Sequence, residues 1–215
     1  MPELPEVQTT VNGLNTNIRG LSILDVWTDY NSKFHKGKDS IKDPAYFKYF
    51  RGEVVGAKIS RVDRLAKNVL IHIEKNPGES IKKSVILVHM KMTGHLLVGR
   101  FIHDRKTDKW TPAPNERASL RDPYNRFIHF VIALSNKKHV ALSDARKFAK
   151  VTLISEEDSG RTVHLAGIGP DPLDKKFTYR LFKERLDRRP VGRIKNVLMD
   201  QMIIAGVGNI YSYEA

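Results

Sequence analysis

Apolar residues at the start of the chain repeat with the period of a helix. The spacings between them are four, three and four positions, which places them on one helix face. The residues are Val7, Val11, Leu14 and Ile18. Gly20 follows as a stop signal, and Pro5 is tolerated at helix entry because the first N–H groups have no helical partner. The pattern predicts a packed helix over residues 5–18.

Short segments rich in β-branched residues follow, separated by turns that carry Gly, Asn, Pro or Lys. They cover residues 22–28, 54–62, 69–73, 85–90, 127–134, 139–142 and 150–154. Segments of this length and composition, bounded by turn residues, predict the strands of an antiparallel sandwich or barrel. A short helix over residues 44–50 is predicted to interrupt them.

Helical spacing returns after Pro172, over residues 179–188 and 191–203. The sequence therefore predicts an α+β protein, with an antiparallel β-sandwich domain flanked by helices over residues 1–160 and a helical domain over residues 161–215. The polar segment 100–126 predicts a functional or mobile loop, because structureless loops of that length are uncommon in compact domains.

Charge narrows the choice of partner. The 215 residues hold 37 Lys and Arg against 24 Asp and Glu, a formal net charge of +13. An excess of this size predicts a polyanionic partner, with nucleic acid first and an anionic membrane surface second. Charge alone would also fit a ribosome-associated basic protein.

Two absences refine that interpretation. No apolar run approaches the roughly 20 residues of a membrane helix, and no leader of the secretory kind opens the chain. We therefore expect an intracellular, cytoplasmic protein, nucleoid-associated if its source is bacterial, with no membrane partner. The chain has no cysteine, which excludes a disulfide, a thiol nucleophile and a Cys-ligated zinc site within these residues.

The opening MPELPEV allows two interpretations. Removal of Met1 would leave Pro2 as a secondary amine, less basic than lysine and able to form an iminium with an aldehyde. Glu3 would then serve as a proton donor, with Glu6 one turn on to orient the site. The alternative is an ordinary helix start, where glutamate complements the helix dipole. Spacing alone leaves both open.

Two further side chains are ambiguous in the same way. Lys67, in RLAKNVL, is either a solvated lysine at a strand entrance or a group that grips a phosphate or carries a proton. His129, in FIHFVIAL, is either a hydrogen-bonded sheet histidine or a phosphate contact.

Three residues could fill the gap left by an extruded nucleotide. Met92, in HMKMTGHL, is either a core methionine or a wedge between bases. Arg146 and Phe148, in SDARKF, offer a guanidinium to an orphaned base and a ring to stack on it, although such alternation is also ordinary in strands. Together they would form a three-part plug.

The stretch AGVGN near the C-terminus indicates a tight turn. Its two glycines allow a turn whose N–H groups, at the start of the next helix, would hold an anion, and Asn209 would add a side-chain donor to a phosphate. The alternative is a joint between helices, with glycine and asparagine as caps.

Six motifs in register give the chain a family resemblance. They are MPELPEV, AKNVL, HMKMTGHL, SDARKF, GPDPL and IKNVLMDQMIIAGVGNIYSYEA. In this order they closely resemble the formamidopyrimidine-DNA glycosylases of the Fpg/Nei family. The opening and the MKMTG turn resemble the formamidopyrimidine and 8-oxoguanine branch more than the endonuclease VIII branch.

The resemblance implies a β-sandwich followed by a helix-two-turn-helix domain. It also implies a monomeric, bifunctional DNA glycosylase and AP lyase that removes oxidised purines from double-stranded DNA by β,δ-elimination and also acts at abasic sites. In that scheme Pro2, freed of Met1, attacks C1′ through a Schiff base, Glu3 is the general acid and Glu6 assists. Lys67 corresponds to the lysine that contacts phosphate and supports β-elimination.

The resemblance also assigns DNA contacts. Met92, Arg146 and Phe148 correspond to the residues that fill the void after base flipping. The DNA-backbone contacts correspond to His129, Arg146, Arg193 and Lys195, with Asn209 as the asparagine of the helix-two-turn-helix.

The sequence departs from the family pattern in three places. The family carries a four-cysteine zinc finger with one structural Zn²⁺, and its hairpin arginine serves DNA binding and δ-elimination. That part would lie beyond residue 215, so we interpret the chain as part of a longer enzyme and expect no metal or cofactor within it. Lys147 and Ala149 stand where the family often has Arg and Gly, and the long loop over residues 100–126 is a further departure. The alternative function is a non-catalytic or impaired protein that binds damaged DNA with the same fold.

Overall fold

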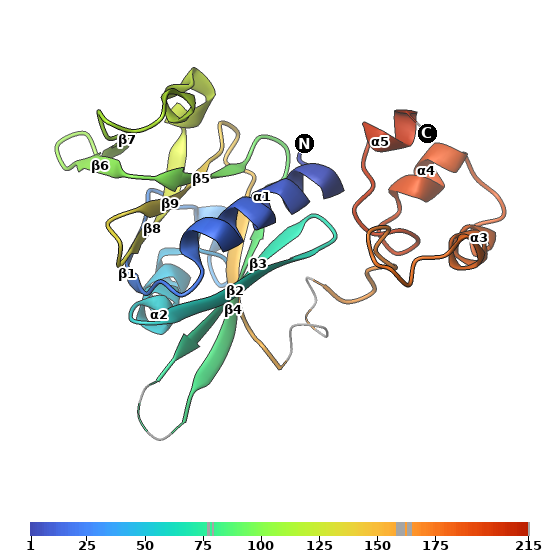
Figure 1. The fold of residues 1–215 in the computed structure, drawn as a ribbon, viewed down its shortest axis with the longest axis horizontal. Coiled ribbons are helices and arrows are strands. Elements are labelled where there is room, and N and C mark those ends of the chain that lie inside the picture. The colour runs from blue at the N-terminus through green and yellow to red at the C-terminus, as the bar shows by residue number, and fades with distance from the viewer. Residues whose placement is uncertain (77, 79, 158–161, 163–164, 215) are drawn as a thin grey trace.

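The computed structural model describes residues 1–76, 78, 80–157, 162 and 165–214. Strands occupy the first part of the chain and helices the last part (Figure 1). The helices are α1 (Leu4–Ile18), η1 (Lys33–His35), α2 (Pro44–Val54), η2 (Ala118–Arg121), η3 (Pro123–Arg126), α3 (Tyr179–Asp187), α4 (Ile194–Met199) and α5 (Tyr211–Glu214). The strands are β1 (Ile23–Thr28), β2 (Lys58–Leu65), β3 (Asn68–Lys75), β4 (Lys82–His89), β5 (His95–Gly99), β6 (Phe101–Asp104), β7 (Lys109–Pro112), β8 (Ile128–Leu134), β9 (His139–Ser143) and β10 (Lys150–Ser155).

Two antiparallel sheets form the predicted sandwich. One sheet has the order β1-β8-β9-β5 and the other β10-β4-β3-β2. Buried aliphatic and aromatic side chains from both sheets make one core with α1 and α2, and Ile71, Ile86, Phe130 and Leu142 are among its members. Each such side chain contributes about 1.5 to 3 kcal/mol on full burial, so this core supplies the main driving force for folding.

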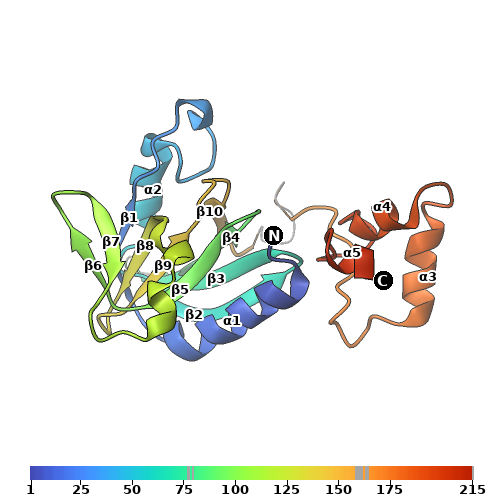
Figure 2. The ribbon, with the colours of Figure 1, turned by 90° about the horizontal axis from the view of Figure 1, so that it is seen from above.

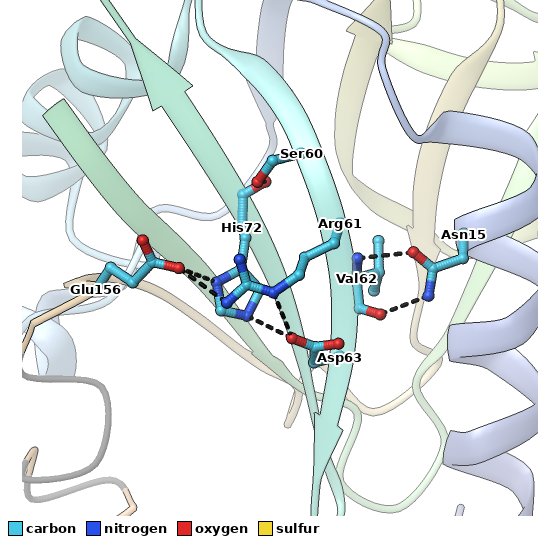
Figure 3. A network of polar contacts seen from close by, with 7 residues as sticks. All are labelled: Asn15, Ser60, Arg61, Val62, Asp63, His72 and Glu156. Carbon is cyan, nitrogen blue, oxygen red and sulfur yellow. Dashed lines mark hydrogen bonds and ion pairs between the residues drawn. The ribbon is translucent and has the colours of Figure 1, made fainter. Parts of the chain in front are cut away.

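The side-chain amide of Asn15 fixes helix α1 against strand β2 of the sheet. The Asn15 side chain accepts a hydrogen bond from the Val62 N–H (2.8 Å) and donates one to the Val62 carbonyl (Figure 3). On strands β2 and β3 of this sheet, Arg61 donates to both Asp63 (2.8 Å) and Glu156 (2.9 Å), and His72 Nδ1 lies 2.8 Å from the Glu156 carboxylate. Helix α1 therefore holds a fixed position along β2, which sets where its N-terminus lies.

The structure corrects the expectation of a strand over residues 54–62. Val54 ends α2 instead, because Phe50 and Val54 lie one helical turn apart and both are fully buried. The chain then turns at Gly56, whose φ of +85° is a conformation that favours glycine, and β2 begins at Lys58.

Three further differences lie at element boundaries. The strand β5 was not predicted, because its five residues follow a turn without clear alternation. Residues 100–126 are not a structureless loop, since they form the β6–β7 hairpin and two short 3₁₀ helices. The helix predicted over 191–203 spans only 194–199, because the Asp200 carbonyl and carboxylate accept hydrogen bonds from the next N–H groups and turn the chain.

The helices α3, α4 and α5 follow the sandwich (Figures 1 and 2). A small apolar cluster of Val197, Ile203 and Ile204 packs against side chains of α3 and α4, among them Phe182 and Leu198. The division predicted between residues 160 and 161 lies outside the described residues. The helical part and the sandwich are joined by an ion pair between Arg64 and Asp171 (2.7 Å), in which the arginine side chain is 5% exposed.

Candidate functional site

The N-terminus of the chain is attached to the AGVGN turn through Glu3. Its carboxylate is 1% exposed and accepts hydrogen bonds from the N–H groups of Gly208 (2.7 Å), Ile210 (2.8 Å) and Tyr211 (3.3 Å). A Cβ on Gly208 would lie 2.4 Å from the Glu3 carboxyl carbon, so only glycine leaves room for this contact. These N–H groups, predicted to hold an anion, hold the chain's own carboxylate.

Glu6 completes the same arrangement. Its carboxylate accepts the Glu3 N–H (2.9 Å) and the Tyr211 hydroxyl (3.1 Å). Burial raises the pKa of Glu6, but these hydrogen bonds outweigh it and the pKa lies below its ordinary value. Pro2, half-buried, directly precedes this locked pair, so its position follows from the helix entry and from the distant turn together.

Lys67 lies close to Glu3 although 64 positions separate them in the chain. It occupies the turn between β2 and β3 after Ala66, whose φ is +52°, and is 8% exposed. Burial lowers its pKa, against the opposing charge of Glu3. A lysine with a lowered pKa exchanges protons more readily near neutral pH.

His89 is a candidate functional residue that the sequence did not predict, although it is the first residue of the HMKMTGHL motif. It ends β4 and pairs with Asn68, the residue after Lys67. Burial, then the charges of Lys91 and Lys67, lower its pKa to about 4, so the ring is neutral at pH 7. Its Nδ1 accepts the Lys91 N–H (3.0 Å), which leaves the proton on Nε2 as a donor. Its pairing with Asn68, the residue after Lys67, is what places it near the candidate site.

The three predicted gap-filling side chains lie together. Met92, Arg146 and Phe148 line one hollow of about 480 Å³, and we call them the wedge. Met92 is 46% and Phe148 51% exposed. The guanidinium of Arg146 stacks on the Phe148 ring at 4.5 Å. The structure therefore favours exposed side chains over a core methionine.

One buried carboxylate positions the wedge. Asp144 is fully buried and accepts hydrogen bonds from the Thr93 hydroxyl, the Arg146 N–H (3.3 Å) and the Ala149 N–H (2.7 Å). It thus joins the turn that carries Met92 to the loop that carries the other two side chains. Gly94 is required in that turn, since a Cβ would lie 2.3 Å from the Met90 carbonyl oxygen.

Replacing Asp144 with asparagine will destabilise the protein. An amide NH₂ cannot accept the hydrogen bonds that the carboxylate accepts, and we expect Asp144→Asn to lose about 2 kcal/mol of unfolding free energy. Urea unfolding measures it, with Asp104→Asn as the control because that carboxylate holds a similar turn at the surface. Equal losses in the two variants would show that Asp144 has no special positioning role.

The remaining predicted contacts lie elsewhere. His129 is 8% exposed and hydrogen-bonded to Asp29 (2.8 Å), whose pKa the histidine and Lys147 lower although burial raises it. Arg193 is the exposed residue before α4, and Lys195 lies 4.7 Å from the Tyr213 ring. Asn209 is exposed in the AGVGN turn. Among the described residues, no hydrogen bond or ion pair joins any of them to Pro2, Glu3 or Lys67, and their roles stay predictions.

The described part of the chain holds no group of His, Asp or Glu side chains that could bind a metal ion, and the chain has no cysteine. These residues do not fit the four-cysteine zinc site of the family resemblance. No described helix is long and apolar enough to cross a membrane.

The β-sandwich and the helical module that holds its N-terminus are each matched by a model of one protein family. Residues 1–151 match the family model "Formamidopyrimidine-DNA glycosylase N-terminal domain", and residues 168–215 match "Formamidopyrimidine-DNA glycosylase H2TH domain". The chain belongs to the formamidopyrimidine-DNA glycosylase family.

Relatives and solved structures agree with this assignment. The chain is 31% identical to the formamidopyrimidine-DNA glycosylase of Herpetosiphon aurantiacus and 32% identical to that of Chloroflexus aurantiacus, with all of this chain covered and 66% and 64% of those proteins. A complex of Lactococcus lactis Fpg with DNA containing an abasic site superposes with a TM-score of 0.71 at 25% identity, covering 98% of this chain and 64% of that one. A structure of MutM with DNA containing carbocyclic 8-oxo-G gives 0.70 at 26% identity, covering 98% and 65%. The chain thus spans less than two thirds of their lengths.

Proposed function

We propose that this protein acts in base-excision repair as a bifunctional DNA glycosylase and AP lyase. Its substrates would be oxidised purines, 8-oxoguanine and formamidopyrimidines, and abasic sites in double-stranded DNA inside the cell. The observation that carries the proposal is the Glu3 carboxylate, which follows Pro2 directly, is locked by three backbone N–H groups and acts with its charge on Lys67, whose pKa burial lowers. Family membership and the DNA complexes of the similar structures support it.

In the first step of the proposed mechanism, the Pro2 nitrogen takes the place of the damaged base at C1′ of the sugar. Once Met1 is removed, the Pro2 nitrogen attacks C1′, the bond from C1′ to the base nitrogen breaks, and the base leaves with a proton from Glu3 or through water. The Pro2 nitrogen then loses its N–H proton and the C1′–O4′ bond breaks as O4′ takes up a proton, which opens the sugar ring and leaves a cationic iminium between the nitrogen and C1′. Glu6, fixed by the Glu3 N–H and the Tyr211 hydroxyl, keeps the helix entry in place.

The second step breaks the strand. The iminium acidifies C2′, which loses a proton to a nearby base as the C3′–O bond breaks and the phosphate leaves with its electron pair. Lys67 is the group we propose for this proton transfer and for contact with that phosphate, because burial lowers its pKa. A second elimination at the 5′ side completes the β,δ sequence.

The proposed DNA contacts use the wedge and four further polar side chains, of which His129 is buried. Met92, Arg146 and Phe148 would enter the stack where the damaged nucleotide has left it. His129, Arg193, Lys195 and Asn209 are proposed to contact the DNA backbone, and the net charge of +13 favours such contacts generally. We propose that the protein acts as a monomer.

Strand cleavage tests the proposed function. A labelled duplex with one 8-oxoguanine is expected to be nicked at the lesion, and the same duplex with guanine to stay intact. Binding to the lesion duplex in a gel without any nick would instead support the alternative, a non-catalytic protein that binds damaged DNA. Lesion-independent binding to RNA would contradict both.

A further inference from the structure

A second hollow, with a cationic lining, adjoins the wedge. Its volume is about 490 Å³, and Lys91 and Phe148 belong both to it and to the hollow of the wedge. Basic side chains dominate this hollow, which we call the lysine hollow. Its ionisable lining residues are His35, Lys38, Lys42, Lys91, Lys150 and Asp39.

Three separate segments build the lysine hollow. Most of the lining belongs to the segment between β1 and α2, while Lys91 follows β4 and Lys150 begins β10. The first segment is pinned by the Ile41 N–H, which donates to the Val151 carbonyl (3.1 Å), and by the Gly37 N–H, which donates to Asp43 (2.8 Å). The lysines are therefore assembled by the tertiary fold rather than by a local run of charge.

Lys42 is the most deeply placed of these cations. It is 7% exposed, and its ammonium group donates to the Lys147 carbonyl (2.6 Å) and lies 5.2 Å from the Tyr30 ring. Within the described residues, no carboxylate forms an ion pair with Lys38, Lys42 or Lys91. The buried Asp144 carboxylate acts on this ammonium group only at a distance, so a further anion in the hollow would help to offset the cost of burying the charge.

The neighbouring cations make the hollow more attractive to an anion. Burial and the charges of the nearby lysines lower the pKa of His35. Burial and the charge of Lys91 lower the pKa of Lys150, although the charge of Asp39 opposes that shift. The pKa of Lys42 is lowered by burial and by Lys91, against the charge of Asp144. Burial is the largest cause of each shift, and the repulsion between neighbouring cations adds to it, which binding of an anion would relieve.

The lysine hollow lies apart from the N-terminus. Figure 2 shows the segment between β1 and α2 projecting from the sandwich on the side of α2, away from the label N. Lys91 lines both the lysine hollow and the hollow of the wedge, and its charge also acts on His89.

We propose that the lysine hollow binds a backbone phosphate of the DNA strand opposite the lesion. The inference rests on the proposed function, in which the wedge enters the base stack and the Pro2 site engages the damaged strand. The two backbones of a duplex run on either side of the stack. A cationic hollow that adjoins the wedge and lies away from Pro2 is therefore placed for the other backbone.

Neutral phosphates in the DNA locate this contact. The 215-residue chain is titrated with a duplex that carries a tetrahydrofuran abasic analogue, and phosphates of the opposite strand are replaced one at a time by uncharged methylphosphonate. We expect one position, or two adjacent ones, to weaken binding by about tenfold at 0.1 M salt. The double variant Lys38→Gln/Lys91→Asn should show the same loss on unmodified duplex, a salt slope smaller by about 1, and no further loss at that position.

The variants are chosen to preserve folding and to separate local from general charge. Lys38 and Lys91 are exposed, and asparagine tolerates the φ of +56° at position 91. The control Lys58→Gln/Lys138→Gln removes the same charge at the start of β2 and in the turn before β9. Equal losses in the two double variants would overturn the proposal.

Other outcomes would also overturn it. They are sensitivity confined to phosphates of the lesion strand, failure to bind the duplex, and binding of inorganic phosphate that depends on Lys38 and Lys91 without any effect of methylphosphonate. Because the tetrahydrofuran analogue cannot be cleaved by the lyase step, this test is independent of strand nicking. A protein that nicks lesion DNA but fails here keeps the proposed function and loses only the lysine hollow.

Discussion

Sodium borohydride will trap this protein on DNA that contains an abasic site or 8-oxoguanine, through a bond between the Pro2 nitrogen and C1′. Borohydride reduces an iminium to a stable amine, so the adduct reports the proposed intermediate directly. A secondary amine gives an iminium with no N–H proton to lose, which therefore stays cationic and attracts electrons during elimination. Intact mass will show Met1 removed, and peptide mapping will place the DNA on the N-terminal peptide.

Substitution at the two prolines of the opening motif separates chemistry from helix entry. Pro2→Gly leaves a primary amine, whose imine can lose its charge, and we expect the rate of adduct formation to fall by about a hundredfold, or about 2.7 kcal/mol of barrier. Pro5→Ala changes a residue in the first turn of α1 and should trap normally. Full trapping by Pro2→Gly, or full lyase activity in protein that retains Met1, would contradict the mechanism.

Replacing Glu3 with glutamine will loosen the helical part from the sandwich. The carboxylate now accepts hydrogen bonds from backbone N–H groups, and the amide NH₂ of glutamine could not accept them. We therefore expect Glu3→Gln to lose about 2 to 3 kcal/mol of unfolding free energy. Amide exchange at Gly208, Ile210 and Tyr211 should accelerate, and trapping should fall because Pro2 loses the support of its neighbour.

The matched control is Glu6→Gln. Glu6 contacts the Glu3 N–H and the Tyr211 hydroxyl but none of the three backbone N–H groups, so its variant should leave their exchange nearly unchanged. Identical exchange in wild type and Glu3→Gln would show that the carboxylate does not hold the turn, whatever the effect on activity.

Local pattern predicted most elements of the fold. The apolar stripe of α1 is confirmed, because helix periodicity is a property of a few consecutive turns and Val7, Val11 and Leu14 are all buried. The two-sheet sandwich is also confirmed. The predicted start of the strand at Val54 was wrong. Valine has a high strand propensity, but Val54 is buried one turn after Phe50 and belongs to α2.

Residue chemistry and order are set by the sequence itself: an N-terminal proline followed by glutamate, the three wedge side chains, a glycine turn and an excess of positive charge. Tertiary structure decided how they act. It placed the Glu3 carboxylate in the AGVGN turn, buried Lys67 beside it, and used Asp144 to join the parts of the wedge. Hydrogen-bond partners and pKa values depend on burial and on neighbours remote in sequence, as does the assembly of the lysine hollow, so no local pattern contains them.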